Sequence, residues 1–365
     1  MASLIRFIRA YTSPDGVQVT VQPTTYQRAG ETLPGLVFKP ATTRGRLPGW
    51  VVLHGLTRTG SSHPGLQRFA RAVAASGSVV LIPDIPEWRE LRVAPAVTID
   101  TIRAAVRALQ QRDDVRHEHA GMLGFSFGAT QALVAATDPD IAEMLHGIAA
   151  WGGYCDLHAA FSFAMTGEHE LDGRRYQIAP DPYGAWVMAG NYLTRVPGHE
   201  GDRDVAQALH SLAIEAGDRG FYAWEPIFDE SKLRLRAQLR PAQREVFDAL
   251  APLTTSPRPA GAFERGLANA LADAAIETDP LLDPRPHLGS VRVPTLIAHG
   301  RDDRLIPFTQ SILLSRRLPP EILKHCVITG LFAHSGGTVA GLKPATRVAE
   351  TVRFVRLLRA LLRHA

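Results

Sequence analysis

Short apolar runs alternate with helically spaced apolar positions over the first 150 residues of the chain. Residues 50–55 (Trp-Val-Val-Leu-His-Gly) form a mostly apolar run that ends in glycine, which is typical of a strand buried on both faces of a sheet. Residues 64–75 carry apolar side chains three and four positions apart, which predicts a helix closed by Gly77. Further strands are expected at 78–82, 121–125 and 147–151, and further helices at 98–109 and 129–136. This alternation predicts an α/β fold with a mostly parallel, doubly wound sheet.

The alternation stops after Gly153 and resumes near residue 291. Residues 154–290 lack buried-strand runs and show helical spacing instead, so we expect a large helical cap inserted into the sheet domain. Helices are expected in the cap at 204–216, 230–250 and 262–276, and the later core is expected to have strands at 293–300 and 325–329 and helices at 309–318 and 345–362. The predicted domains are a core of residues 1–153 and 291–365 and a cap of residues 154–290.

The start of the chain is expected to contribute strands. Residues 16–39 combine an alternating stretch with a short β-rich run, separated by prolines, which favours an entry hairpin. Residues 1–11 are apolar at four positions, but Arg6 and Arg9 interrupt them, so they lack the apolar core of a signal peptide and are interpreted as a first strand. A leader removed upstream would leave the same sequence.

Composition narrows the classes of protein that fit. With 365 residues, 45% of them hydrophobic and 21% charged, the chain can bury a full-sized core beside a second unit. The net charge of +4 comes mostly from scattered arginines that build no basic stripe, so no nucleic-acid partner is expected. Two cysteines, Cys155 and Cys326, make no disulfide framework, and no apolar run has the length of a membrane span. A cytoplasmic location is expected.

The most informative motif is at residues 124–128 (Gly-Phe-Ser-Phe-Gly), where a predicted buried strand meets a predicted helix. A sharp turn between strand and helix can hold a serine out of the backbone in a strained conformation, which exposes its hydroxyl to a base. The two backbones pass close together in such a turn, so the positions two residues before and after the serine need minimal side chains. Gly124 and Gly128 meet that need and make Ser126 the candidate nucleophile.

With this motif the sequence resembles the α/β-hydrolase superfamily, and the resemblance covers nearly the whole chain outside residues 154–290. His54, Gly55 and Leu56 end an early buried strand and match the HG motif of that superfamily. The resemblance implies that the backbone N–H groups of Leu56 and Phe127 form an oxyanion hole. Two donors are what the developing oxyanion of an acyl transfer requires. For His54 itself, a buried packing role is the alternative.

Two later loops supply the other residues that the resemblance implies. Residues 300–307 resemble the acid loop of the superfamily, and Asp303 stands where the carboxylate that orients the base is expected, with Asp302 as its rival. His334, in the loop after the last predicted strand, matches the catalytic histidine. The order Ser126, Asp303, His334 is the order of this fold. If neither aspartate in the acid loop served, Asp156 would be the remaining candidate.

The implied reaction is covalent catalysis by Ser126, with His334 as general base and Asp303 orienting it. It needs no metal and no organic cofactor. The histidines and glutamates at 117–119 and 169–170 lack a completing ligand set, so a metal site is not expected there. The expected partner is a small-molecule acyl substrate, and the sequence leaves the oligomeric state open.

Substrate contacts are expected between the carboxyl edge of the sheet and the cap. The candidates for the pocket wall are aromatic, although each could instead pack in a hydrophobic core: Trp88, Trp151 and Tyr154, which lie at or after the ends of predicted strands, and Trp186, Tyr192, Phe221 and Trp224 in the cap. The expected function is hydrolysis of carboxylic esters of medium size and largely apolar character. An acyltransferase, thioesterase, amidase or carbon–carbon bond hydrolase with the same triad, or a catalytically silent binding protein, remains the alternative.

Overall fold

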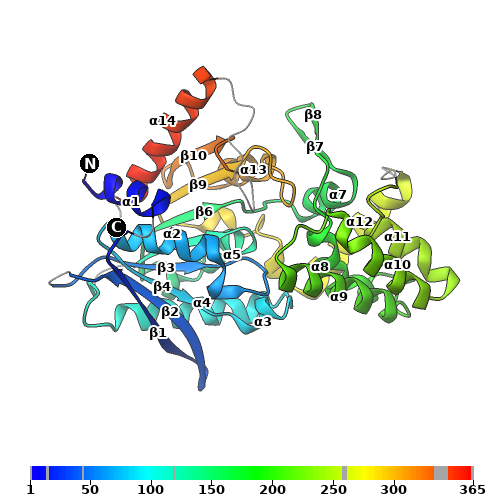
Figure 1. Ribbon diagram of the computed structural model, residues 1–365, viewed down its shortest axis with the longest axis horizontal. Helices are drawn as coiled ribbons and strands as arrows, with labels where there is room; N and C mark the ends of the chain where they lie inside the picture. Colours follow the sequence, from blue (N-terminus) through cyan, green and yellow to red (C-terminus); the bar gives the residue numbers. More distant parts are fainter. Residues whose placement is uncertain are drawn as a thin grey trace.

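A computed structural model describes residues 2–13, 16–42, 45–117, 120–256, 261–332 and 344–362. Its central sheet has eight strands in the order β1-β2-β4-β3-β5-β6-β9-β10 (Figure 1). The strands are β1 (Val19–Arg28), β2 (Glu31–Pro40), β3 (Gly49–Leu53), β4 (Val79–Pro83), β5 (Ala120–Phe125), β6 (Leu145–Trp151), β9 (Thr295–Gly300) and β10 (Leu323–Thr329). The first two strands form the expected entry hairpin and run antiparallel, whereas all pairs from β4 to β10 are parallel. The predicted mostly parallel sheet is confirmed.

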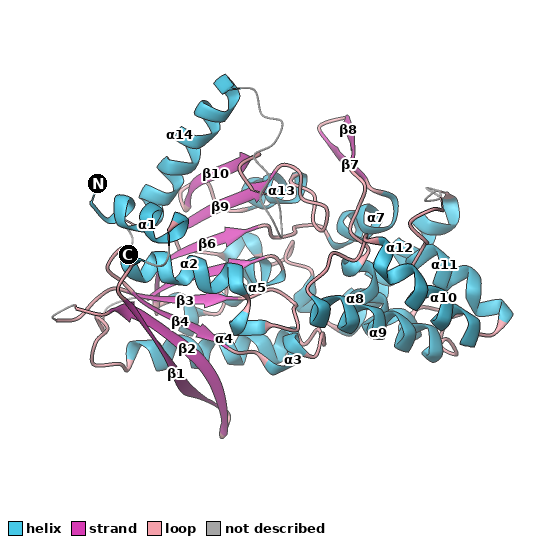
Figure 2. Cartoon of the chain, in the orientation of Figure 1, coloured by secondary structure: helices cyan, strands magenta, loops and turns pink. Residues whose placement is uncertain are grey.

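Helices cover both faces of this sheet (Figure 2). Apolar side chains alternate between the faces along each strand, as at Val51 and Val52 in β3, and so separate two hydrophobic cores. One core is closed by α1 (Ala2–Thr12), α2 (Pro64–Ala75) and α14 (Pro344–Leu361). The other is closed by α4 (Pro95–Gln110), α5 (Phe127–Ala135) and α13 (Thr309–Arg317), with the short helices α3 (Pro86–Arg89) and α6 (Pro139–Ala142) nearby. The doubly wound arrangement is therefore confirmed.

The first element is a helix, so the strand expected at residues 1–11 was wrong. Leu4, Phe7 and Ala10 are buried and lie three residues apart, which places them on one face of α1. Phe7 packs edge-on against Phe69 of α2, with ring centroids 5.5 Å apart. The arginines that interrupt the apolar run are the polar face of this helix, and the run was too short for its period to be recognised.

Residues 152–294, which we call the insertion, connect the neighbouring parallel strands β6 and β9, and the helices α7 to α12 of this insertion lie beyond the carboxyl ends of the parallel strands (Figure 1). Its helices are α7 (Leu157–Thr166), α8 (Tyr183–Tyr192), α9 (Arg203–Arg219), α10 (Asp229–Gln238), α11 (Arg244–Leu250) and α12 (Ala262–Thr278), and its strands β7 (Glu168–Leu171) and β8 (Arg174–Gln177) form a separate hairpin. The hairpin was not predicted. The single helix expected at 230–250 is two helices, because Pro241 starts a new turn between them.

Short 3-10 turns complete the description: Gly60–Ser62, Leu193–Arg195, Pro226–Phe228, Pro241–Gln243, Pro280–Leu282 and Leu288–Ser290. Across the described ranges, the helices are too short or too polar to cross a membrane.

Candidate active site

Ser126 occupies a strained turn between β5 and α5. Its backbone has φ 56° and ψ −126°, a region that residues with a side chain rarely adopt. A Cβ on Gly124 would clash with the carbonyl of Gly128, and a Cβ on Gly128 would clash with the carbonyl of His54. Both glycines are therefore required by the close approach of strand, helix and the chain after β3. The geometry is that of the strand-to-helix turn that the 124–128 motif predicts.

The chain after β3 passes directly beside Ser126. A Cβ on Gly55 would lie 3.2 Å from the Ser126 Cβ and 3.6 Å from its Oγ. Leu56 follows Gly55, and Phe127 begins α5, where the helix dipole favours negative charge. Within the described part of the chain, the N–H groups of Leu56 and Phe127 have no acceptor. The two donors expected for an oxyanion are thus on the two segments that flank Ser126.

The His54 ring fixes the peptide group that contains the Leu56 N–H. Its Nε2 accepts the Ile85 N–H at 3.2 Å, so the proton is on Nδ1, which donates to the Gly55 carbonyl at 2.7 Å. That carbonyl and the Leu56 N–H belong to one trans peptide and point in opposite directions. Burial lowers the pKa of His54 to about 4, so the ring is neutral at pH 7. The histidine is buried, as the alternative interpretation held, and it also orients the backbone.

The two aspartates of the acid loop differ sharply. Asp303 is 1% exposed, and its Oδ1 accepts the backbone N–H groups of Leu305 at 2.8 Å and Ile306 at 2.9 Å. Its Oδ2 lies 3.2 Å from Nε2 of the buried His299. Asp302 is exposed. The backbone and His299 therefore hold the Asp303 carboxylate in place at the carboxyl edge of the sheet, and the geometry favours Asp303 over Asp302 as the acid.

His334 lies outside the described residues, but the chain that leads to its loop is described as far as Phe332. Glu350 of α14 is buried and accepts the Gly330 N–H at 2.5 Å and the Arg301 guanidinium at 2.9 Å. Burial opposes the ionisation of Glu350, but these donors hold its pKa below the ordinary value. One carboxylate thus joins the beginning of the acid loop to the beginning of the His334 loop. Sequence reasoning missed Glu350, because it lies in a helix whose pattern predicts only packing.

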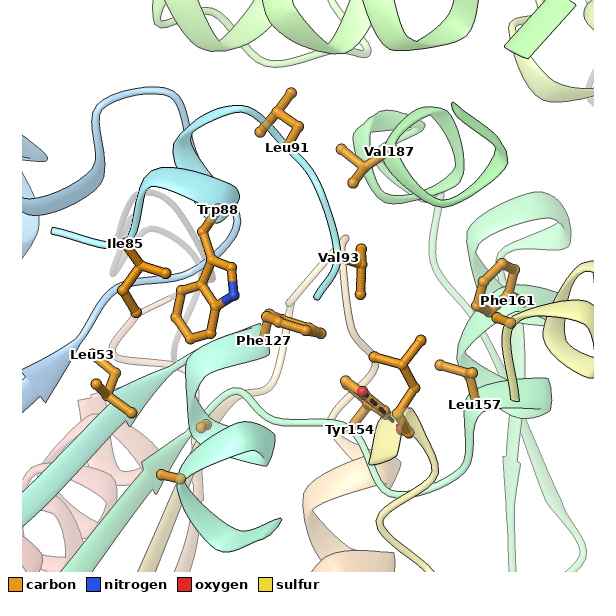
Figure 3. Close-up of a cluster of buried hydrophobic side chains, with 14 of the residues drawn as sticks. Leu53, Ile85, Trp88, Leu91, Val93, Phe127, Tyr154, Leu157, Phe161 and Val187 are labelled. Atoms are coloured by element: carbon orange, nitrogen blue, oxygen red, sulfur yellow. Dashed lines mark hydrogen bonds between the residues drawn. The ribbon is translucent and has the colours of Figure 1, made fainter. Parts of the chain in front are cut away.

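The three aromatic residues expected to contact substrate are all buried. Trp88 donates to Thr98 Oγ1 at 3.0 Å, and the Tyr154 hydroxyl donates to the Leu282 carbonyl at 2.9 Å. Both belong to one apolar cluster with Phe127, to which the insertion also contributes side chains (Figure 3). Trp151 packs in the core on the other face of the sheet and stacks on Phe332, with ring centroids 6.0 Å apart. A substrate-binding role for the three stays a prediction.

The aromatic candidates in the insertion occupy different environments. Trp186 is fully buried and donates to the Leu250 carbonyl at 3.0 Å, so it belongs to the core of the insertion. Trp224 is half-buried and stacks on Tyr222, and the Arg304 guanidinium lies 3.9 Å from its ring centroid. Trp224 therefore borders the acid loop, whereas Trp186 packs within the insertion.

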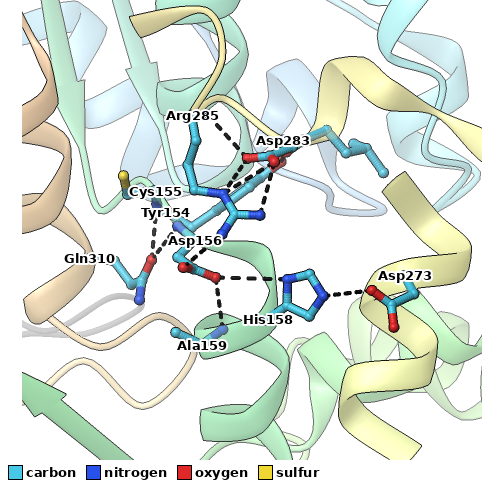
Figure 4. A network of polar contacts seen from close by, with 10 residues as sticks. Tyr154, Cys155, Asp156, His158, Ala159, Asp273, Asp283, Arg285 and Gln310 are labelled. Atoms are coloured by element: carbon cyan, nitrogen blue, oxygen red, sulfur yellow. Dashed lines mark hydrogen bonds and ion pairs between the residues drawn. The ribbon is translucent and has the colours of Figure 1, made fainter. Parts of the chain in front are cut away.

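Asp156 is engaged where the insertion leaves and rejoins the core (Figure 4). Its Oδ1 accepts the Ala159 N–H at 3.1 Å and caps α7, and its Oδ2 pairs with Arg285 at 3.0 Å. Arg285 also pairs with Asp283 at 2.8 Å. Asp156 therefore has a structural role, because its contacts join the segment where the insertion leaves the core to the segment where it returns.

The insertion also binds the loops around Ser126. The Tyr183 hydroxyl donates to the Leu56 carbonyl at 3.1 Å, and Arg58 pairs with Asp218 at 2.9 Å. Next to Asp303, Arg304 donates to the Ala179 carbonyl at 2.7 Å. Sequence reasoning missed these contacts because they join residues more than one hundred positions apart, for which the pattern carries no signal.

Comparison with known proteins gives distant likenesses. No family model matches this chain. A curated protein from Bradyrhizobium sp, named "Probable 2-oxo-3-(5-oxofuran-2-ylidene)propanoate lactonase", is 31% identical over 129 residues, which are 31% of this chain and 49% of that protein. The match therefore spans about half the length of this curated relative.

Two solved structures align over nearly all of the chain. Brefeldin A esterase, described as a bacterial homologue of human hormone-sensitive lipase, aligns with a TM-score of 0.51 and 17% identity over 99% of this chain and 84% of its own. Pyrococcus horikoshii acylaminoacyl peptidase aligns with a TM-score of 0.53 and 12% identity over 97% of this chain and 43% of its own. At such identities the likeness concerns the fold.

Proposed function

This chain has the α/β-hydrolase fold, and we propose that it is a serine hydrolase that cleaves carboxylic esters through an acyl-serine intermediate. The observation that carries the proposal is the strained backbone of Ser126, with φ 56°. A residue held in such a conformation costs on the order of 1 to 3 kcal/mol of folding free energy. A strained turn at this position exposes the Ser126 hydroxyl beside two backbone donors, which is a chemical reason for the strain.

In the proposed reaction the Ser126 hydroxyl attacks the carbonyl carbon of the ester while His334 takes its proton. Asp303 orients the imidazole, and the N–H groups of Leu56 and Phe127 bind the oxyanion of the tetrahedral intermediate. The intermediate collapses with loss of the alcohol, to which His334 returns the proton. Water activated by the same histidine then cleaves the acyl-serine and restores the enzyme.

The insertion is proposed to be a cap that covers Ser126 and sets substrate preference. Its Tyr183 hydroxyl contacts Leu56, which follows Gly55, the residue that passes beside Ser126. The apolar cluster of Trp88, Phe127 and Tyr154 favours a medium-sized, largely apolar acyl substrate. The name of the Bradyrhizobium protein fits this chemistry, because a lactone is a cyclic carboxylic ester.

The test is a panel of p-nitrophenyl esters from acetate to palmitate, combined with fluorophosphonate labelling, on the wild type and Ser126→Ala. We expect ester hydrolysis and labelling by the wild type and a loss on the order of 10⁴-fold or more in kcat in the variant, because triad members act as a unit. A catalytically silent binding protein would stay unlabelled. Activity of Ser126→Ala within tenfold of the wild type would exclude Ser126 as the nucleophile.

A further inference from the structure

Leu56 is held from two sides by hydrogen bonds to its neighbouring peptide groups. On the core side, the His54 ring donates to the Gly55 carbonyl. On the insertion side, Tyr183, the first residue of α8, donates its hydroxyl proton to the Leu56 carbonyl at 3.1 Å. The first bond fixes the peptide plane before Leu56 and the second fixes the plane after it. The first bond thus fixes the peptide that carries the Leu56 N–H, and the second limits rotation of the backbone on the other side of Leu56.

Tyr183 is in turn fixed relative to the acid loop. Its backbone N–H donates to Asp181 Oδ1 at 3.0 Å, and the Asp181 N–H donates to the Arg304 carbonyl at 2.7 Å. The Arg304 side chain returns to the Ala179 carbonyl at 2.7 Å. Residues 179–183, which we call the strap, therefore bind both the residue after Asp303 and the residue that offers the oxyanion donor. The strap links the two loops across the site.

The Tyr183 hydroxyl keeps the proton that it donates to the Leu56 carbonyl. Burial raises the pKa of Tyr183, and the nearby Asp181 carboxylate raises it further, so the phenol keeps its proton at and above neutral pH. Arg58 gives the same loop a second contact with the insertion, through its pair with Asp218, but it acts two residues beyond Leu56. Tyr183 is the residue of the insertion that binds the Leu56 carbonyl.

We propose that Tyr183 is a positioning residue, which aims the Leu56 N–H at the oxyanion by holding the Leu56 carbonyl. This inference rests on the proposed function, because it assigns a task within the same site. Removing an oxyanion donor outright lowers kcat by about 10²- to 10³-fold. Loss of the Tyr183 hydroxyl leaves the donor present but less well aimed, so we expect a loss of about tenfold to a hundredfold in kcat.

The test compares Tyr183→Phe with Tyr192→Phe. Both tyrosines belong to α8, and both hydroxyls make a hydrogen bond. Tyr192 is buried and donates to Asp279 at 2.6 Å, so it packs within the insertion and is not part of the pocket wall considered for it from the sequence. The two variants therefore remove the same atom from the same helix, and only one removal reaches the oxyanion loop. We expect similar small changes in Tm for both, and a loss of kcat for Tyr183→Phe alone.

Two further readouts separate positioning from general damage. Phenylboronic acid forms a tetrahedral adduct with an active serine, so its inhibition constant should rise by the same factor as kcat/KM falls, while KM for the ester stays within about twofold. The rate of fluorophosphonate labelling at Ser126 should fall by a similar factor. Labelling of both variants at the wild-type rate, with unchanged boronate inhibition, would overturn this inference alone. A wild type that neither hydrolyses esters nor is labelled would overturn the proposed function and the inference with it.

Discussion

The loops around Ser126 and the insertion are stabilised in different ways. Around Ser126 the main chain sets the geometry, because Gly124 and Gly128 allow close backbone contacts and backbone N–H groups bind the Asp303 carboxylate. In the insertion, side-chain ion pairs recur, such as Arg236 with Asp248 at 2.6 Å. Backbone contacts leave almost no room for substitution, whereas an exposed ion pair contributes about 0 to 1 kcal/mol. A single substitution near Ser126 should therefore cause a large loss of stability, whereas a single substitution in the insertion should cause a small one.

The two adjacent aspartates of the acid loop should differ strongly in their effect on kcat. Asp303→Asn should lower kcat by about 10³- to 10⁴-fold at pH 7, because an amide favours the wrong tautomer of the base. Asp302→Asn should lose at most a few-fold, since Asp302 is exposed. Steady-state kinetics on one ester checks both. Reversed results would assign the role of the acid to Asp302 and would not affect the assignment of Ser126 as the nucleophile.

A glycine pair tests the contrast between the two regions directly. Gly128→Ala should lower the free energy of unfolding by about 3 kcal/mol or more, because its Cβ meets the His54 carbonyl. Gly266→Ala should instead raise it by up to about 1 kcal/mol, because Gly266 is exposed within α12 and nothing lies within 4 Å of the new Cβ. Urea denaturation measures both. Equal effects of the two substitutions would contradict the contrast.

A further prediction concerns pH and the buried His54. Its pKa is about 4 in the folded chain against an ordinary value of 6.5, so between these values the unfolded chain binds the proton more strongly. The contribution of His54 to the free energy of unfolding is therefore complete above pH 6.5. As the pH falls toward 4, the free energy of unfolding decreases by roughly 3 kcal/mol at most. His54→Asn keeps an amide donor for the Gly55 carbonyl and should show a shallower fall between pH 7 and 4.5. Urea denaturation at several pH values measures the free energy of unfolding of both proteins. The same pH dependence in the wild type and in His54→Asn would show that His54 does not titrate in this way.

The sequence predicted the backbone of the site better than its side-chain supports. The β5–α5 turn follows from local glycine spacing, and the position of Asp303 follows from the resemblance of its loop, so both were placed without knowledge of tertiary contacts. The Tyr183 bond to Leu56 spans 127 positions and has no local pattern. The α1 helix was missed because eleven residues give a weak period, and the break at Pro241 was overlooked within a longer helical spacing. His334 remains a prediction from its place in the sequence.

The Arg285 contacts with Asp156 and Asp283 have a consequence for how such a protein can change over time. Both crossings of the insertion meet at this one guanidinium, beside two strands that pair directly through Ile148 and Thr295. Asp156 and Arg285 are in contact at 3.0 Å, so a short loop could replace the chain between them, while residues 286–294 keep the crossover to the start of β9 that parallel strands require. Recombination could therefore exchange the segment between Asp156 and Arg285 at two nearby junctions and leave the strand order intact. Chains with this sheet could acquire new substrate preferences by grafting at this stem while the Ser126 turn is inherited unchanged.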